Sequence, residues 1–296
     1  MIQVARMERS DVDAGAEILF DAFGAVYRQR GHVPPFPTRD SAAWLCRAYL
    51  DLDPEGCVVA WSGNEAVGVG FAHPRGAVTS IGPLAARPGA PAGVARALMA
   101  EIGRVAAQSS SLRLFQDSFN PDSFGLYARL GYAVADVAPY LLAEKLLPPS
   151  AAPPGVRALR PDDLPAIERY DRARTIADRR RDLALLASTG SGLVAGGEAG
   201  NGGKISGYIF YRPLPARVVI GPGVADSAET MADLVDGVAA ALPGRAAVIR
   251  ASAAAPLVLL RAFARGFRVD HLGNLMVAGP YAPPPAQLYA LFPESL

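Results

Sequence analysis

The stretch that decides the fold reads LRLFQDSFNPDSFGLYARLGYAV and covers residues 112–134. It opens with a short apolar run of strand length, which Asn120 and Pro121 interrupt. Apolar residues at helical spacing then continue to Leu130, and Gly131 stands where a left-handed C-cap ends a helix. The stretch therefore predicts a strand, a turn and a helix, followed by another extended segment.

The polar residues of this stretch have a spacing of their own. The order Asn120, Ser123, Tyr127, Gly131 and Tyr132 gives the pattern N-x-x-S-x-x-x-Y-x-x-x-G-Y. This pattern resembles the acceptor-side half of the acyl-CoA site in the GNAT superfamily of N-acetyltransferases. The resemblance implies that Tyr127 stands beside the sulfur of coenzyme A. A phenol of pKa about 10 can protonate a leaving thiolate, so Tyr127 is the candidate proton donor. The structural alternative is a helix whose tyrosine merely packs.

A second stretch, RPGAPAGVARALM at residues 87–99, lies between a predicted fourth strand and a predicted helix. Helix N-terminal N–H groups and nearby glycines suit a phosphate group. In the family pattern, Gly93 and Ala95 match the second half, whereas Ala90 stands where a basic or amide residue is expected. Arg87 and Arg96 are the candidates for the missing positive charge. Together, the residues expected to contact the cofactor are Leu84, Ala85, Arg87, Gly89, Ala92, Gly93, Val94, Ala95, Arg96, Asn120, Ser123 and Tyr127.

The general base is left open by the sequence. An ammonium acceptor must lose a proton before it attacks, and a carboxylate, a histidine or ordered water could take that proton. The candidates are His73, in a turn predicted just beyond the third strand, Asp117, at the end of the fifth strand, and His32, in the loop after the first helix. Each is also typical of an ordinary turn or surface. The N–H groups of Leu84 and Ala85 are candidates to receive the oxyanion, and no metal site is predicted.

The chain repeats itself after a proline-rich linker at residues 148–155. The triplet Ile-Gly-Pro at 81–83 recurs at 220–222, and Leu-Gly-Tyr at 130–132 recurs as Arg-Gly-Phe at 265–267. Matches in the same order predict a second copy of one fold. We therefore expect an α/β (α+β) protein with two tandem GNAT-like domains, at 1–147 and 156–296. Each should hold a mixed, mostly antiparallel twisted sheet flanked by helices.

The second copy is expected to be degenerate. In the register of the later repeat, Ala262 takes the place of Tyr127 and Ala255 that of Asn120. An arginine-rich segment at 172–181 either receives an anionic acceptor group or forms a salt-bridged helix face. A single active site, in the first domain, is the resulting prediction.

The composition of the chain argues against nucleic acid and membrane as binding partners. A formal net charge of +1 provides no field for nucleic acid, and no apolar run is long enough to span a bilayer. A cytoplasmic protein is expected. Cys46 and Cys57 are isolated, which favours buried structural thiols over a disulfide or zinc site.

The resemblance implies an enzyme that moves an acetyl group from acetyl-CoA directly to an amine, with a primary amine of a small molecule as the first candidate acceptor. Antibiotic-like amines and peptide N-termini stay open. The small residues Gly82, Ala85 and Ala86 also leave open a longer acyl chain. The alternative is a non-catalytic protein that binds acyl-CoA or a small molecule as a sensor. Monomer and homodimer are both compatible with the sequence.

Overall fold

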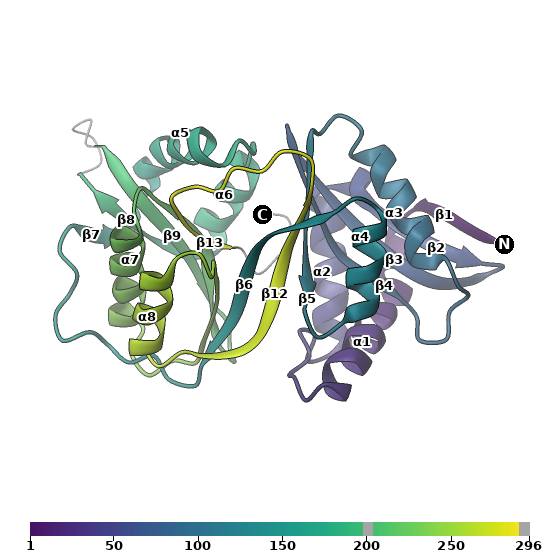
Figure 1. The fold of residues 1–296 in the computed structure, drawn as a ribbon, viewed down its shortest axis with the longest axis horizontal. Helices are drawn as coiled ribbons and strands as arrows, with labels where there is room; N and C mark the ends of the chain where they lie inside the picture. The colour runs from purple at the N-terminus through teal and green to yellow at the C-terminus, as the bar shows by residue number, and fades with distance from the viewer. Residues whose placement is uncertain (198–203, 290–296) are drawn as a thin grey trace. The chain divides into compact units, whose positions relative to one another are not determined.

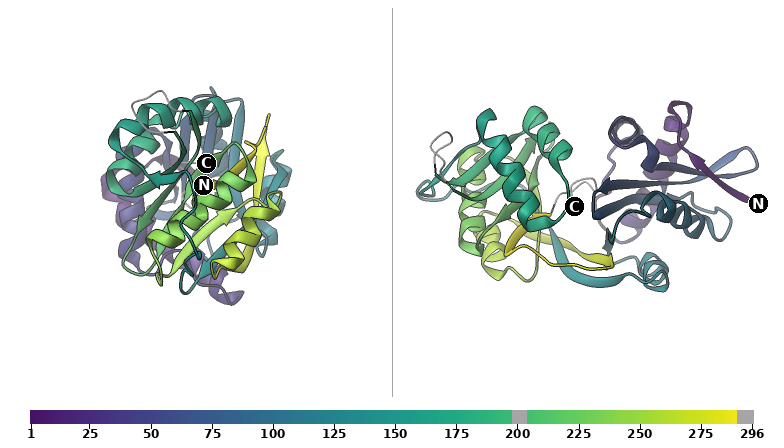
Figure 2. Two further views of the ribbon diagram at one scale, coloured as in Figure 1. Left: turned by 90° about the vertical axis from the view of Figure 1, so that its left-hand side faces the viewer. Right: turned by 90° about the horizontal axis from the view of Figure 1, so that it is seen from above.

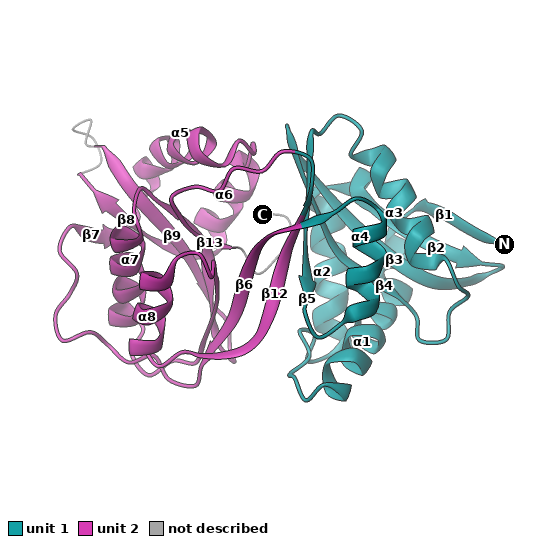
Figure 3. Cartoon of the chain, in the orientation of Figure 1, with its two compact units in different colours: residues 1–133, 277–279 teal, residues 134–276, 280–296 magenta. Residues whose placement is uncertain are grey.

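The computed structural model describes residues 1–197 and 204–289. By its internal contacts the chain divides into two compact units (Figure 3). Unit 1 is Met1–Ala133 with Val277–Gly279, and unit 2 is the described part of Val134–Met276 and Pro280–Leu296. The domain limits 1–147, 148–155 and 156–296 were drawn from the proline-rich linker and the repeated motifs rather than from contacts, and they stay a prediction. A search of the described helices found none with the length and apolar character of a membrane span.

Unit 1 is a five-stranded sheet with helices on both faces (Figure 1). The strands follow the order β1-β2-β3-β4-β5, antiparallel throughout except for the parallel pair β4–β5. Its elements are β1 (Ile2–Arg6), the 3-10 turn η1 (Arg9–Asp11), α1 (Val12–Gln29), α2 (Arg39–Leu52), the 3-10 turn η2 (Pro54–Gly56), β2 (Cys57–Ser62), β3 (Glu65–Arg75), β4 (Val78–Ala86), α3 (Val94–Val105), β5 (Ser111–Asp117) and α4 (Pro121–Arg129).

Successive side chains of β3 point to opposite faces of the sheet, and their contacts show which helix covers each face. A Cβ at Gly68 would meet Val94 and Leu98 of α3, whereas Gly15 of α1 faces the neighbouring residue Val69. Because successive residues of a strand point to opposite faces, α1 and α3 cover opposite sides of the sheet. The glycine at position 68 allows α3 to pack closely against the strand.

Strand β3 corrects one sequence prediction. A turn was expected at residues 73–76, but β3 continues to Arg75, which pairs with Val78 of β4. His73 is therefore a strand residue, and its side chain is fully buried. The polar residues His73 and Arg75 fit inside because both bind the carboxylate of Asp53, which lies directly after α2.

Unit 2 is a larger mixed sheet, with the strand order β12-β6-β11-β13-β10-β9-β8-β7. Its elements are β6 (Ala133–Ala143), β7 (Val156–Ala158), the 3-10 turn η3 (Pro161–Asp163), α5 (Leu164–Thr175), α6 (Arg180–Thr189), β8 (Ser191–Gly196), β9 (Ile205–Pro213), β10 (Val218–Ala225), α7 (Ala228–Ala241), β11 (Ala247–Ala251), α8 (Pro256–Ala264), β12 (Arg268–Ala278) and β13 (Ala286–Tyr289). The first residue of β6 and the last residues of β12 are grouped with unit 1.

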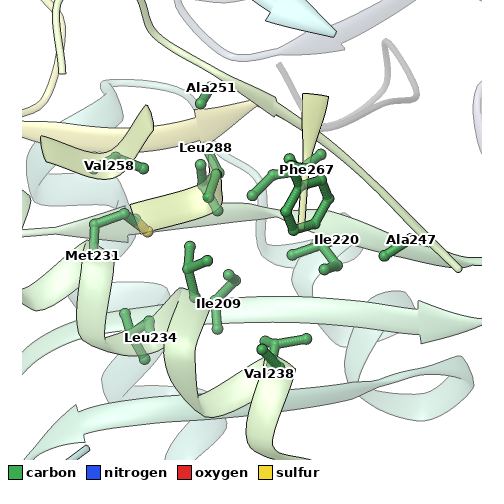
Figure 4. Close-up of a cluster of buried hydrophobic side chains, with 14 of the residues drawn as sticks. Ile209, Ile220, Met231, Leu234, Val238, Ala247, Ala251, Val258, Phe267 and Leu288 are labelled. Atoms are coloured by element: carbon green, nitrogen blue, oxygen red, sulfur yellow. The ribbon is translucent and has the colours of Figure 1, made fainter. Parts of the chain in front are cut away.

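Two separate cores lie on the two faces of this sheet. Ile209 of β9 belongs to a cluster with Met231 and Leu234 of α7 (Figure 4). Its neighbours Tyr208 and Phe210 belong to another cluster, built with α5 and α6. Figure 2 shows the two helical layers with the sheet between them, α5 and α6 on one side and α7 and α8 on the other. The alternation along β9 therefore explains the three-layer arrangement.

Both units carry the same irregularity in corresponding strands. In unit 1 the register between β3 and β4 shifts at Gly82-Pro83, and in unit 2 the register between β9 and β10 shifts at Gly221-Pro222. In each case two residues of the later strand lie opposite one residue of the earlier strand, which is a β-bulge. The repeated Ile-Gly-Pro triplet thus marks one structural feature present twice, and the expected fold class is confirmed.

The helix ends confirm the later repeat as well. The N–H groups of Gly131 and Tyr132 donate to the carbonyls of Ala128 and Tyr127 at 3.1 Å each, which is the Schellman pattern. Gly131 has a φ of 88°, as the predicted left-handed C-cap requires. The same bonds recur after α8, from Gly266 and Phe267.

Replacing Gly131 by alanine tests this cap. No atom lies within 4 Å of the added Cβ, so the cost is the left-handed backbone alone. We expect the free energy of unfolding to fall by about 1 kcal/mol. Gly103→Ala is the matched control, because Gly103 lies inside α3 with equally open space and no positive φ. That change should stabilise by about 0.5–1 kcal/mol. Urea unfolding of both variants gives the comparison, and equal effects would refute the explanation.

Candidate active site

The centre of the candidate site is the point where β4 and β5 separate. Their parallel pairing runs from Val78 with Ser111 to Ile81 with Leu114. Beyond the bulge, residues 84–86 pair with β3, and no pairing with β5 is found among the described residues. A strand with only one paired edge leaves backbone donors and acceptors on its other edge. The split between β4 and β5 can therefore hold an extended polar chain.

Tyr127 lies in α4, the helix that follows β5. Its side chain is 8% exposed, and its ring meets that of Tyr132 edge-on at a centroid distance of 6.1 Å. Burial, assisted by the charge of Asp117, raises the pKa of Tyr127 to about 12. No hydrogen bond joins its hydroxyl to another described residue. The phenol thus stays protonated at neutral pH, with its O–H available as a donor.

Asp117 ends β5 and lies close enough to Tyr127 to affect its ionisation. The hydroxyl of Tyr27, from α1, donates to the Asp117 carboxylate at 2.6 Å. The ring of Phe119 packs against Tyr27 at 5.0 Å and stacks on His32 at 4.6 Å. Two of the three candidate bases, Asp117 and His32, are therefore gathered around the end of β5.

His73 occupies a different environment. Its Nδ1 is 2.7 Å from Oδ2 of Asp53, and its Nε2 is 3.3 Å from the carbonyl oxygen of Gly82 in the bulge. With no exposed surface, His73 has both ring nitrogens engaged. The contact with Gly82 connects the end of α2, through Asp53, to the bulge beside the split.

Asn120 and Ser123 take part in a helix cap. The side-chain oxygen of Asn120 accepts from the N–H of Ser123 at 3.3 Å, and the Ser123 hydroxyl donates to the Asn120 carbonyl at 2.9 Å. Gln116, 2% exposed, donates its side-chain N–H to the Asn120 carbonyl at 2.7 Å. These bonds fix the turn between β5 and α4, and so orient the helix that carries Tyr127.

The turn before α3, where a phosphate was predicted to bind, has an open backbone. Gly93 is the N-cap with a φ of 96°, and a Cβ there would come only within 3.9 Å of Ile2. Gly89 has no atom within 4 Å of its own Cβ position. Together with the first N–H groups of α3, this open backbone suits a phosphate. Arg96 in the first turn is exposed.

Arg87 is already paired. Its Nη1 is 3.2 Å from Glu17 of α1, and its Nε donates to the Ala66 carbonyl at 3.3 Å. A second carboxylate, Glu65, lies 3.6 Å from Nε. Much of the charge of Arg87 is therefore balanced within the protein, which leaves Arg96 as the stronger candidate to replace the basic residue missing at Ala90.

The arginine-rich segment at residues 172–181 in unit 2 forms salt bridges within the protein, which was one of the two alternatives that the sequence left open. Arg179 is 5% exposed and binds Asp171, and Arg180 binds Asp178 through two bonds of 2.7–2.8 Å. Arg174 binds Asp226 and covers the ring of Tyr170. These arginines have intramolecular partners, so nothing in their contacts calls for an anionic acceptor.

Sequence reasoning missed three residues of this site. Tyr27 and Phe119 were not singled out, and Gln116 was counted within an apolar strand. A signal existed for Gln116, a polar residue in a buried strand directly before the turn. None existed for Tyr27, which meets Asp117 across 90 residues of sequence.

Comparison with known proteins adds the family. The sequence pattern of the acetyltransferase (GNAT) family matches residues 18–132, which include the split, the α3 turn and Tyr127. This part of the chain is thus similar to the GNAT family. GNAT acetyltransferases bind acyl-CoA and catalyse acyl transfer. The stretch at 87–99 lies within the matched residues, and so does the stretch at 112–134 except for its last two residues. A search of curated protein sequences gave no match.

Solved structures extend the GNAT likeness to the whole chain. A putative acetyltransferase from Pyrococcus horikoshii has a TM-score of 0.75 at 17% identity, covering 99% of this chain and 95% of its own. A GCN5-related N-acetyltransferase from Sphaerobacter thermophilus gives 0.64 at 16% identity over 95% of this chain and 97% of its own. A tandem GNAT protein from the clavulanic acid biosynthesis pathway gives 0.60 at 14%, over 95% and 100%. The chain thus has the tandem GNAT fold.

Proposed function

We propose that this protein is an N-acetyltransferase that moves the acetyl group of acetyl-CoA directly to a primary amine of a small molecule. The observation that carries the proposal is the split between β4 and β5, together with Asp117 at the end of β5 and Tyr127 close to Asp117. The GNAT match over the same residues supports it.

The residues present fit an acyl-CoA donor. The unpaired edge of residues 84–86 offers peptide N–H and C=O groups to an extended chain with amide bonds. Gly93 and the first turn of α3 would hold the phosphates, with Arg96 nearby and open space at Gly89. When bound, the thioester supplies an activated acetyl group and a thiolate leaving group.

The chain's own groups would move the protons. Tyr127 keeps its proton well above neutral pH, so it can donate to a thiolate that leaves beside it. The carboxylate of Asp117, held by the Tyr27 hydroxyl, would attract an ammonium group and take a proton from it. For His73 we propose a positioning role, because its ring is engaged by Asp53 and Gly82. Neither cysteine is needed, since Cys46 and Cys57 are buried and no covalent intermediate is required.

A small molecule is the acceptor we propose because Asp117 is a single carboxylate bound by an aromatic residue. Tyr27, which binds Asp117, packs against Phe119, and Phe119 stacks on His32. No run of acidic residues extends from Asp117 in the sequence. A cytoplasmic location and a single active site, in the first copy, belong to the same proposal.

One observation favours the alternative of a non-catalytic acyl-CoA sensor. The phosphate turn carries Ala90 and Pro91, and the charge of Arg87 is balanced by Glu17. Weak donor binding without turnover would follow if Arg96 could not compensate.

Release of free thiol from acetyl-CoA, measured across a panel of small primary amines, tests the proposal. We expect thiol release that depends on the amine, together with an N-acetyl product by mass spectrometry. Saturable coenzyme A binding without thiol release for any amine would favour the sensor, and the absence of binding would reject both. Propionyl-CoA and butyryl-CoA in the same assay would define the acyl length.

A further inference from the structure

In unit 2 the position that corresponds to the split is filled by the chain itself. Strands β10 and β11 pair in parallel from Val218 with Ala247 to Ile220 with Ile249, and then separate after the Gly221-Pro222 bulge. Strand β13 lies between the separated ends and is antiparallel to both. Leu288 pairs with Gly223 on one side and with Ala251 on the other.

The comparison with unit 1 shows what has changed. There β4 and β5 separate at the equivalent point, after the equivalent bulge, and among the described residues of unit 1 no strand lies between them. In unit 2 the exposed backbone edges of β10 and β11 are satisfied by peptide groups of β13. A peptide strand therefore fills the gap between β10 and β11, which corresponds to the split between β4 and β5.

The side chains of β13 fit this gap on both faces. Ala286 and Leu288 are each 2% exposed and belong to the core cluster that includes residues of α7 and α8. Leu288 is labelled in Figure 4. On the other face, Gln287 donates to the hydroxyls of Tyr281 and Tyr289 at 2.9 Å each. The Tyr289 hydroxyl in turn donates to Asp136 of β6. The surrounding residues thus contact each side chain of β13 in turn: a small one, an amide, an apolar one and a phenol.

The residues around the gap between β10 and β11 also differ from their counterparts in unit 1. Ala262 and Ala255, which take the places of Tyr127 and Asn120, belong to the same apolar cluster as Leu288. The turn before α7 carries Asp226, which is bound to Arg174, where a phosphate would need positive charge. The polar groups expected around an acyl donor are absent from these positions, and an apolar pocket for a strand residue is present.

We infer that the gap between β10 and β11 is a peptide-strand-binding site, with β13 as its resident ligand, and that it takes an extended peptide of the pattern Ala-Gln-Leu-Tyr in place of an acyl donor. Recognition is by strand addition on two edges, with Leu288 as the anchor. This assignment does not depend on transfer activity in unit 1.

A cut in the connection before β13 tests the inference on the folded chain. A specific protease sequence inserted between Ala282 and Pro283, both exposed, allows cleavage after folding. We expect the fragment that begins at Pro283 to co-elute with the body in size-exclusion chromatography. A fluorescent peptide of residues 283–289 should then exchange into the site. The same peptide with Leu288→Asp should bind at least about tenfold more weakly, since it would bury a charge in the apolar cluster.

Three outcomes with the cut chain would overturn the inference. The fragment could separate from a body that keeps its native circular dichroism, the Leu288→Asp peptide could bind as well as the parent peptide, or coenzyme A could displace the peptide. A measurement on the uncut chain guards against damage by cleavage. Amide exchange at residues 286–289 should be slow in the parent protein and in the Leu272→Asp control, where the side chain is 46% exposed, and fast in Leu288→Asp. Fast exchange in the parent protein would also refute a bound strand.

Discussion

Tyr127→Phe is expected to lower kcat for amine acetylation by about 100-fold, with little change in KM for acetyl-CoA. The substitution removes only the hydroxyl, so packing against Tyr132 is retained and the lost function is proton donation. Steady-state kinetics with a fixed amine acceptor measure both constants. An unchanged kcat would remove Tyr127 from the mechanism.

Tyr132→Phe is the matched control for this result. Tyr132 is 6% exposed and its ring contacts that of Tyr127, but it lies after the helix, beyond the Schellman cap. We expect its kcat to stay close to that of the parent enzyme. Equal losses in the two variants would indicate damaged packing rather than lost chemistry.

The pH dependence follows from the direction of the Tyr127 shift. Because burial and the nearby Asp117 raise its pKa to about 12, the donor form is present throughout the range in which enzymes are assayed. Any loss of kcat on the alkaline side below about pH 11 should therefore persist in Tyr127→Phe, since it must come from another group.

Asp53→Asn is expected to reduce the free energy of unfolding by about 3–5 kcal/mol. Asp53 is 8% exposed and accepts from both terminal nitrogens of the Arg75 guanidinium, at 2.9 and 2.8 Å, and it also binds His73. A neutral amide would remove the negative charge that Asp53 places against the buried Arg75 guanidinium. Urea unfolding measures the loss.

Asp51→Asn provides the control at a nearly adjacent position. Asp51 pairs with Arg9, but both side chains are more than half exposed. Its removal should change stability by less than about 1 kcal/mol, as for other surface pairs. Similar losses for the two variants would contradict the role we give to burial.

Acid should remove the stabilisation of the fold that Asp53 provides. Burial alone would raise the pKa of this carboxyl, but the hydrogen bonds from His73 and Arg75 outweigh it and hold the pKa below its usual value. The stabilisation is then complete above the unfolded pKa of about 3.9 and is lost as the pH falls through the lower folded value. The difference between parent and Asp53→Asn should be constant near neutral pH and shrink below about pH 4.

The sequence predicted those parts of the fold that local patterns specify. The strand, turn and helix expected within residues 112–134 were found as β5 and α4, because an apolar run, the Asn120-Pro121 turn and Gly131 mark their limits. Gly131 was recognised as a cap because only a left-handed residue ends a helix in that way. The bulges were visible as a repeated Ile-Gly-Pro, although their shape was not.

Other features depend on distant partners. Pro74 and Gly76 indicated a turn, but the ladder between β3 and β4 continues past Pro74, and Asp53 neutralises the charge that this brings inside. Strand β13 has only four residues and follows a proline-rich segment, so its local pattern is weak. Its existence depends on two strands made earlier in the chain. The proposed roles of Tyr127, Asp117 and the α3 turn remain predictions that the kinetic experiments address.

The position of β13 late in the chain also has a consequence during protein synthesis. Both of its neighbours leave the ribosome first, so the nascent chain passes through a stage in which β10 and β11 diverge with bare edges. Open strand edges invite pairing with other chains. Translation pauses or premature stops between residues 251 and 286 should therefore yield products that aggregate or depend on chaperones, whereas chains extended past Tyr289 should not.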